Sequence, residues 1–193
     1  MSVSADLAED NPWWSDPTSI RRDMKIVDLD NSIVDWKPRI AHTFDFSKDL
    51  VYSLRGPRQV GKTTLIKLQI KQKMDGGVSP YSIMYYAFDV DTSPKDLVNI
   101  VKEYLDGIRR LRKNDRCYIF LDEVSAVKDW QRGIKRLWDQ GRLANCTVVA
   151  TGSNTIDIKT SSEKMPGRRG ASRWQKKVQE YNNQNFKWIL ISL

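Results

Sequence analysis

The sequence has few of the residues that hold small zinc-binding and disulfide-linked domains together. Its 193 residues include two cysteines, Cys117 and Cys146, and one histidine, His42. Each cysteine begins an apolar run, so we expect two small buried side chains and neither a disulfide nor a zinc site. No serine, cysteine or second histidine forms a catalytic pattern with His42, so we expect that residue to be structural or exposed.

Long hydrophobic runs are also absent. No stretch approaches the roughly 20 apolar residues that a membrane-spanning helix needs. Residues 1–20 lack the basic start and apolar centre of a signal peptide. We therefore expect a cytoplasmic protein with no membrane partner. Hydrophobic residues still make up 40% of the chain, which is enough to fill the core of one domain.

Charge of one sign is missing from the first part of the chain, because residues 1–20 carry acids but no lysine or arginine. Residues 155–193, by contrast, hold eight basic and three acidic side chains, and the net charge is +8. The basic end could meet an acidic partner. No aromatic RNA-binding motif accompanies it, so the charge does not by itself indicate nucleic acid, and contact with DNA or RNA stays open.

Apolar and amphipathic segments alternate from residue 49 onward. The apolar segments are nearly continuous, which is typical of parallel strands buried on both faces. The amphipathic segments have helical spacing, and Ser93, Pro94 and Asp96 supply an N-cap, a first-turn proline and a third-position acid. The predicted fold class is α/β, a mostly parallel sheet with helices on both faces. We predict strands at 49–55, 81–90, 117–124 and 146–154, and helices at 64–74, 93–111 and 130–141.

Residues 54–64 read LRGPRQVGKTT and match the phosphate-binding pattern G-x-x-x-x-G-K-[ST] between a predicted strand and a predicted helix. Such a loop directs backbone N–H groups and a helix macrodipole at phosphate oxygens. The alternative is a glycine turn and a helix cap, but chance would give this pattern in about one per cent of chains of this length. We predict that the loop binds ATP through Gly56, Pro57, Arg58, Gln59, Val60, Gly61, Lys62, Thr63 and Thr64.

Two acids follow the apolar run that ends at residue 121. Lys62 is expected to reach the β- and γ-phosphates, and the Thr63 hydroxyl to bind Mg²⁺. Asp122 is expected to hold the same Mg²⁺, directly or through water, because strand ends line the ligand crevice of such a sheet. Glu123 is then placed to polarise a water for attack on the γ-phosphate. The alternative is an exposed strand end.

Two further segments contain candidate catalytic residues. The strand ending in TGSN offers Ser153 and Asn154, whose polar groups could bond the γ-phosphate or the attacking water; the alternative is a plain turn. Arg168 and Arg169, in PGRRG, could supply positive charge to the transition state, in this chain or in a neighbour. The alternative for these arginines is a solvated basic loop.

Taken in order, these segments resemble the archaeal branch of the AAA-type P-loop ATPases. The resemblance implies a three-layer domain with sheet order 5-1-4-3-2, and ATP and Mg²⁺ as cofactors. It implies nucleotide and metal binding by Lys62 and Thr63, metal binding by Asp122, activation of water by Glu123 and γ-phosphate sensing by Ser153 or Asn154. The matching segments are NPWW (11–14), RGPRQVGKTTL (55–65), YIFLDEV (118–124), DWQRGIKRLWDQG (129–141), TGSN (151–154) and MPGRRG (165–170).

The predicted organisation has three parts. Residues 1–48 form a leader packed on the core, residues 49–170 the P-loop ATPase domain, and residues 171–193 a divergent or truncated tail. We expect the leader tryptophans Trp13, Trp14 and Trp36 to pack on the core, the alternative being that they flank the adenine. In the tail, FKWILISL could serve as a fifth strand or stay an exposed end.

Three functions are compatible with these residues. The first is a Mg²⁺-dependent ATPase that acts as a conformational switch or motor, with a protein partner or by self-association. The second is a truncated module that binds ATP or ADP without significant turnover. A small-molecule kinase also uses a P-loop, but the adjacent Asp122 and Glu123 and the sensor-like strand favour water as the acceptor.

Overall fold

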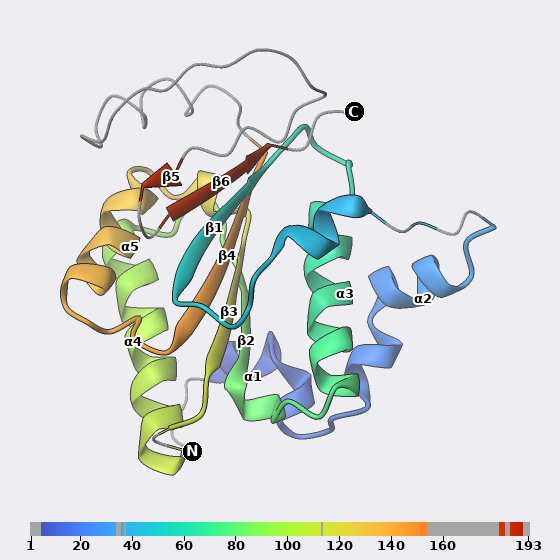
Figure 1. Ribbon diagram of the computed structural model, residues 1–193, viewed down its shortest axis with the longest axis horizontal. Helices are drawn as coiled ribbons and strands as arrows, with labels where there is room; N and C mark the ends of the chain where they lie inside the picture. Colours follow the sequence, from blue (N-terminus) through green and yellow to red (C-terminus); the bar gives the residue numbers. More distant parts are fainter. Residues whose placement is uncertain are drawn as a thin grey trace.

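The sheet of this protein runs through its centre, with helices on both faces (Figure 1). The computed structural model describes residues 5–33, 36, 38–112, 114–153, 182–183 and 186–190. The strand order is β2-β3-β4-β1-β6-β5, and all neighbours are parallel except β5 with β6. The strands are β1 (Leu50–Arg55), β2 (Ile83–Ala87), β3 (Cys117–Asp122), β4 (Cys146–Gly152), β5 (Asn182–Asn183) and β6 (Phe186–Leu190).

The parallel strands confirm the predicted α/β class. When they are numbered along the chain, with β6 as the fifth, their order is 5-1-4-3-2, as expected. The two-residue antiparallel β5 beside β6 is an addition that the sequence did not indicate. Every residue of β1 and β4 is buried, which explains why these strands read as continuous apolar runs.

The C-terminal segment joins this sheet. Residues Phe186 to Leu190 pair in parallel with Val51 to Arg55 of β1. Of the two expectations for FKWILISL, the fifth strand is therefore the one observed. It covers the edge of β1 that β4 leaves open.

Three longer helices cover the sheet. Helix α3 (Lys62–Asp75) lies on one face, and α4 (Pro94–Leu111) and α5 (Trp130–Asp139) pack together on the other (Figure 1). The start of α4 has the expected capping box, in which Ser93 accepts from the Asp96 N–H and the Asp96 carboxylate accepts from the Ser93 N–H. No helix in the described part of the chain is long and apolar enough to span a bilayer.

The strand predicted over residues 81–90 is shorter than expected. Pro80 to Ser82 form a 3-10 turn, so β2 begins at Ile83 and ends at Ala87. Proline sets a turn-like backbone and cannot donate to a strand ladder, which explains the later start.

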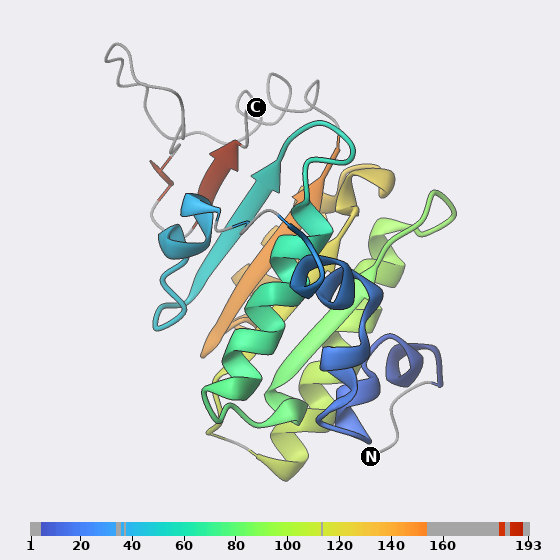
Figure 2. The same ribbon diagram turned by 90° about the vertical axis from the view of Figure 1, so that its right-hand side faces the viewer.

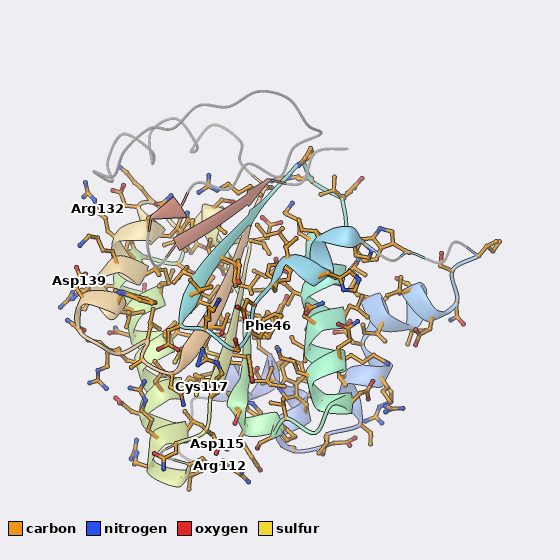
Figure 3. The ribbon with its side chains drawn as sticks, in the orientation of Figure 1. Phe46, Arg112, Asp115, Cys117, Arg132 and Asp139 are labelled. Carbon is orange, nitrogen blue, oxygen red and sulfur yellow. The ribbon has the colours of Figure 1, made fainter. Side chains whose placement is uncertain are left out.

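Both cysteines lie at the amino ends of β3 and β4, the end of the sheet away from the phosphate-binding loop, where Figure 3 labels Cys117. They are free and buried, with 3% and 1% of Cys117 and Cys146 exposed, and they pair in register across β3 and β4. The prediction of two small buried side chains is confirmed. His42 is exposed, in agreement with the expectation for it.

The N-terminal leader lies beside β2 and α3 in both ribbon views (Figures 1 and 2). Its side chains form hydrogen bonds with backbone groups of β2, the strand at one end of the sheet. The Asn11 amide donates to the Tyr85 carbonyl at 2.8 Å and accepts from the Tyr85 N–H at 2.6 Å. The indole N–H groups of Trp13 and Trp14 donate to the Ile83 carbonyl. The leader elements are α1 (Ala5–Glu9), η1 (Pro12–Trp14), η2 (Ser19–Arg22), α2 (Met24–Asp30) and η3 (Arg39–Thr43).

Replacement of Asn11 tests how much this edge contact stabilises the domain. Asn11→Ala leaves a buried N–H and a buried carbonyl of Tyr85 without their partner, so we expect a loss of about 1–3 kcal/mol in the free energy of unfolding. Urea denaturation measures it. Asn31→Ala, at the exposed C-cap of α2, is the control and should change the free energy by less than about 0.5 kcal/mol. Equal losses in the two variants would contradict the assignment.

Candidate functional site

The loop between β1 and α3 has the backbone that phosphate binding requires. It joins Arg55, the last residue of β1, to Lys62, the first residue of α3. Gln59 and Gly61 are left-handed, with φ of 64° and 86°. Gly61 is the N-cap of α3 and has no side-chain oxygen to occupy the helix N–H groups. These groups are therefore available to an anion, and the macrodipole adds positive charge there.

Lys62 folds back across the loop. Its side chain is buried, and its amine donates to the carbonyls of Gly56 at 3.0 Å and Pro57 at 2.8 Å. The amine is therefore held inside the curve of the loop by acceptors weaker than a phosphate oxygen. Thr63 and Thr64 follow in the first turn of α3, and both are half-buried.

Trp36 of the leader lies against this loop. A Cβ atom placed on Gly61 would come within 3.0 Å of Trp36 Cζ2. Trp36 is partly buried against the core, and Trp13 and Trp14 are buried in it, so all three tryptophans pack as predicted. Among the three, Trp36 is the one that borders the loop, so the alternative of contact with a bound adenine applies to Trp36.

Asp122 ends β3 and is only 2% exposed. Thr151 donates from its hydroxyl to Oδ1, and the Glu123 N–H donates to the same oxygen at 3.1 Å. The Tyr85 hydroxyl donates to Oδ2 at 3.1 Å. Burial and the Asp122 charge raise the pKa of Tyr85 far above its usual value, so the phenol stays protonated and remains a donor. Asp122 is therefore an oriented acceptor of three hydrogen bonds.

Glu123 departs from the strand geometry. Its backbone is left-handed, with φ 50° and ψ 32°, at the N-cap of the 3-10 turn η5 (Val124–Ala126). A non-glycine residue in this region is strained by about 1–2 kcal/mol, and such strain concentrates at functional sites. Its N–H is shared between Asp122 Oδ1 and Thr151 Oγ1, each at 3.1 Å, which fixes the turn. The two adjacent acids therefore differ in environment.

The end of β4 approaches this turn closely. Ser125 in η5 accepts from the Ser153 N–H at 3.2 Å, and a Cβ atom on Gly152 would lie 2.9 Å from Ser125 Cβ. Only glycine at 152 permits this approach. Ser153 is thus brought to the Asp122–Glu123 corner, as predicted from its strand-end position, whereas Asn154 lies outside the described residues.

Two residues at this corner were not among the sequence candidates. Thr151 and Tyr85 donate to the two oxygens of Asp122. The strand register explains why Thr151 reaches Asp122, because Leu121 pairs with Ala150 and the next positions are therefore neighbours. No pattern in the sequence indicated this pairing. Arg168 and Arg169 lie outside the described residues, so their roles stay predictions.

The strand pairing brings the parts of the site to one edge of the sheet. Arg55 pairs with Gly152 across β1 and β4, and β4 also pairs with β3. The carboxyl ends of parallel strands share an edge, so the loop, Asp122 and Thr151 lie together there. A sequence model of the family described as an AAA domain matches residues 48–181, well over half of the chain. The chain belongs to the AAA domain family.

Solved structures similar to this AAA domain include Caenorhabditis elegans PCH-2, at 15% identity and TM-score 0.37, covering 97% of this chain and 43% of that one. A HORMA:CdnC:Trip13 complex of E. coli MS115-1 matches at 15% identity and TM-score 0.35, and the match covers 77% of this chain and 51% of that one. The DnaC helicase loader matches at 21% identity and TM-score 0.32, and the match covers 64% of this chain and 71% of that one. This chain thus spans about half the length of the first two chains. No curated protein sequence matches it.

The comparisons bear out an AAA-type P-loop ATPase as the class of this domain. The archaeal branch stays a prediction. Within the described residues, no group of three or more His, Cys, Asp or Glu side chains forms a metal cage. A Mg²⁺ site does not need one, because this ion usually keeps waters and binds through one or two carboxylates and the substrate phosphates.

Substitution of Gly61 tests the loop geometry. Gly61→Ala forces alanine to φ 86° and drives its Cβ against Trp36, so we expect at least about 1–2 kcal/mol of destabilisation and loss of nucleotide binding. Gly77→Ala is the matched control, because Gly77 follows the same helix with φ 84° and a Cβ atom placed on it would have no neighbour within 4 Å. It should lose similar stability but keep nucleotide binding, as measured by thermal unfolding and a fluorescent ATP analogue. Equal binding by both variants would contradict the role given to Gly61.

Proposed function

We propose that this AAA domain binds ATP with Mg²⁺ and hydrolyses it, and that the hydrolysis cycle drives a conformational change. The observation that carries the proposal is the contrast between Asp122 and Glu123. Asp122 is buried and its oxygens accept three hydrogen bonds, whereas the half-buried Glu123 is turned out of the strand by a left-handed backbone. A module that only bound nucleotide would need the first acid but not the strained second one.

The residues present fit a Mg²⁺–ATP complex. Residues 56–64 supply backbone N–H groups for the phosphates, and the Lys62 amine can exchange two carbonyl acceptors for β- and γ-phosphate oxygens. The Thr63 hydroxyl and the Asp122 carboxylate are oxygen donors of the kind that Mg²⁺ prefers. Bound there, the ion would neutralise charge that develops on the phosphates.

Glu123 is proposed as the general base. Its neighbour Asp122 is unsuited to that task, because three donors already hold its two oxygens. Glu123 would orient the attacking water and draw its proton as the water oxygen bonds to the γ-phosphorus. The bond from that phosphorus to the oxygen it shares with the β-phosphate would break, so that ADP and phosphate leave. Ser153 would bond the γ-phosphate or that water, and the same role is proposed for Asn154. Arg168 and Arg169 are proposed to stabilise the charge of the transition state.

A nucleotide-binding module without turnover is the second candidate. The observation that favours it is that the left-handed loop backbone, the buried Lys62 and the buried Asp122 all serve binding, which does not require Glu123. Action on a protein partner, self-association, contact with nucleic acid and a cytoplasmic location all stay proposals.

Replacement of Glu123 separates turnover from binding. We expect Glu123→Gln to reduce phosphate release by about 10²–10⁴-fold, because the amide cannot take a proton, while Mg²⁺–ATP affinity stays unchanged. Lys62→Ala should weaken binding itself. Phosphate release and equilibrium binding are measured side by side.

Glu9→Gln, at the exposed end of α1, is the control and should behave as wild type. Binding without phosphate release by the wild type would favour the second candidate. Full turnover by Glu123→Gln would remove Glu123 from the mechanism.

A further inference from the structure

Tyr85 is in contact with three different parts of the molecule. Its backbone N–H and carbonyl both bond the Asn11 amide of the leader. Its ring lies under the Lys67 amine, which is 3.7 Å from the ring centroid. Its hydroxyl donates to Asp122 at 3.1 Å. The ring and hydroxyl contacts depend on the tyrosine side chain, whereas the contact with Asn11 is made by the backbone.

The hydroxyl contact restricts how Asp122 can bind a further ligand. An ionised carboxylate offers about four acceptor positions, two on each oxygen. On Oδ1, both are taken, by the Thr151 hydroxyl and the Glu123 N–H. On Oδ2, Tyr85 takes one. Among the contacts made by described residues, the acceptor position that remains on Asp122 is therefore on Oδ2, and the direction of the Tyr85 hydroxyl sets the direction of that position.

The ring of Tyr85 is fixed in turn by Lys67. This lysine lies in α3, the helix that begins with Lys62 and Thr63 of the phosphate-binding loop, and its side chain is only 10% exposed. Its amine is 3.2 Å from Asp23 Oδ2 and also lies 5.4 Å from the Trp13 ring centroid. A buried ammonium needs such partners, because it has lost its water.

Asp23 and Trp13 belong to the leader. Asp23 also caps α2, where it accepts from the Lys25 N–H at 2.9 Å. The leader therefore meets Tyr85 twice, at the backbone through Asn11 and at the ring through Lys67. Two sites linked in this way bias each other by the same factor, because coupling free energies are reciprocal.

We propose that Tyr85 is a positioning residue for the Mg²⁺-binding carboxylate of Asp122, and that Lys67 and Asp23 connect this carboxylate to the N-terminal leader. The proposal rests on the proposed Mg²⁺–ATP binding. Its consequence is that the leader is part of the metal site although it supplies no metal ligand. Docking of the leader favours Mg²⁺–nucleotide binding, and Mg²⁺–nucleotide binding favours docking of the leader.

The decisive measurement is the preference for Mg²⁺–nucleotide, taken as the ratio of the dissociation constants of a non-hydrolysable ATP analogue in EDTA and in Mg²⁺. Tyr85→Phe removes one oxygen atom and keeps the ring under Lys67. We expect the preference to fall about fivefold or more, with the constant in EDTA unchanged within twofold. A purely structural role would lower the melting temperature and leave this ratio alone.

Tyr104→Phe is the matched control. Tyr104 is fully buried, and its hydroxyl donates at 3.0 Å to the Tyr81 carbonyl, away from Asp122. The variant loses the hydrogen bonding of this hydroxyl and should keep the wild-type preference. Equal preferences in Tyr85→Phe, Tyr104→Phe and the wild type would overturn the role of Tyr85.

The connection to the leader is tested by Lys67→Met, which keeps most of the apolar stem and removes the charge. We expect it to lower the Mg²⁺ preference in the wild type but to add little in Tyr85→Phe, because the two residues act in one chain of contacts. Lys71→Met is the control, one turn further along α3 and paired with Asp75 at 2.9 Å. The link to the leader would be overturned if Lys67→Met left the Mg²⁺ preference unchanged. It would also be overturned if the free-energy changes in this preference caused by Lys67→Met and Tyr85→Phe added fully in the double variant.

The failures of the two proposals can be told apart. If the wild type binds no nucleotide in either Mg²⁺ or EDTA, the proposed function is wrong and this inference falls with it. If the wild type prefers Mg²⁺–nucleotide and Tyr85→Phe keeps the whole preference, the proposed function stands and only this inference is wrong.

Discussion

The site depends on the burial of one carboxylate. Asp122 has lost nearly all contact with water, and an uncompensated charge in that position would strongly destabilise the fold. Its partners come from β2, β4 and the turn that follows β3. All three hydrogen bonds to the carboxylate therefore form only when three strands are in register and the turn at Glu123 has formed. Correct folding of the sheet and correct geometry of the site are the same requirement.

The leader shows how a segment outside the family match can belong to the same unit. The match begins at residue 48, yet Asn11, Trp13 and Trp14 occupy backbone groups of β2. An uncovered edge strand is prone to pair with other chains, so this cover also protects the sheet. The other end of the sheet is extended by β6 and β5. The leader thus covers β2 at one end of the sheet, and β6 and β5 extend the sheet beyond β1 at the other.

Much of the fold followed from local patterns. Continuous apolar runs identified β1, β3 and β4, and the Ser93 capping box identified the start of α4. Patterns were weaker where proline intervened, as in the shortened β2, and where two residues formed β5 by pairing alone. Residues 1–48 were predicted to pack on the core, but their composition gave no way to assign Asn11 to Tyr85, since that contact joins positions 74 residues apart.

By itself, the sequence determined the phosphate-binding loop, the two acids Asp122 and Glu123 at the end of β3 and the class of the sheet, because each depends on residue types at short, fixed spacings. Only the tertiary structure decided which groups hold Asp122, that Glu123 adopts a left-handed backbone, and that Lys67 joins Tyr85 to the leader. These contacts join strands and helices far apart in the chain. Their geometry depends on strand register and helix packing, and no local pattern of residues encodes either.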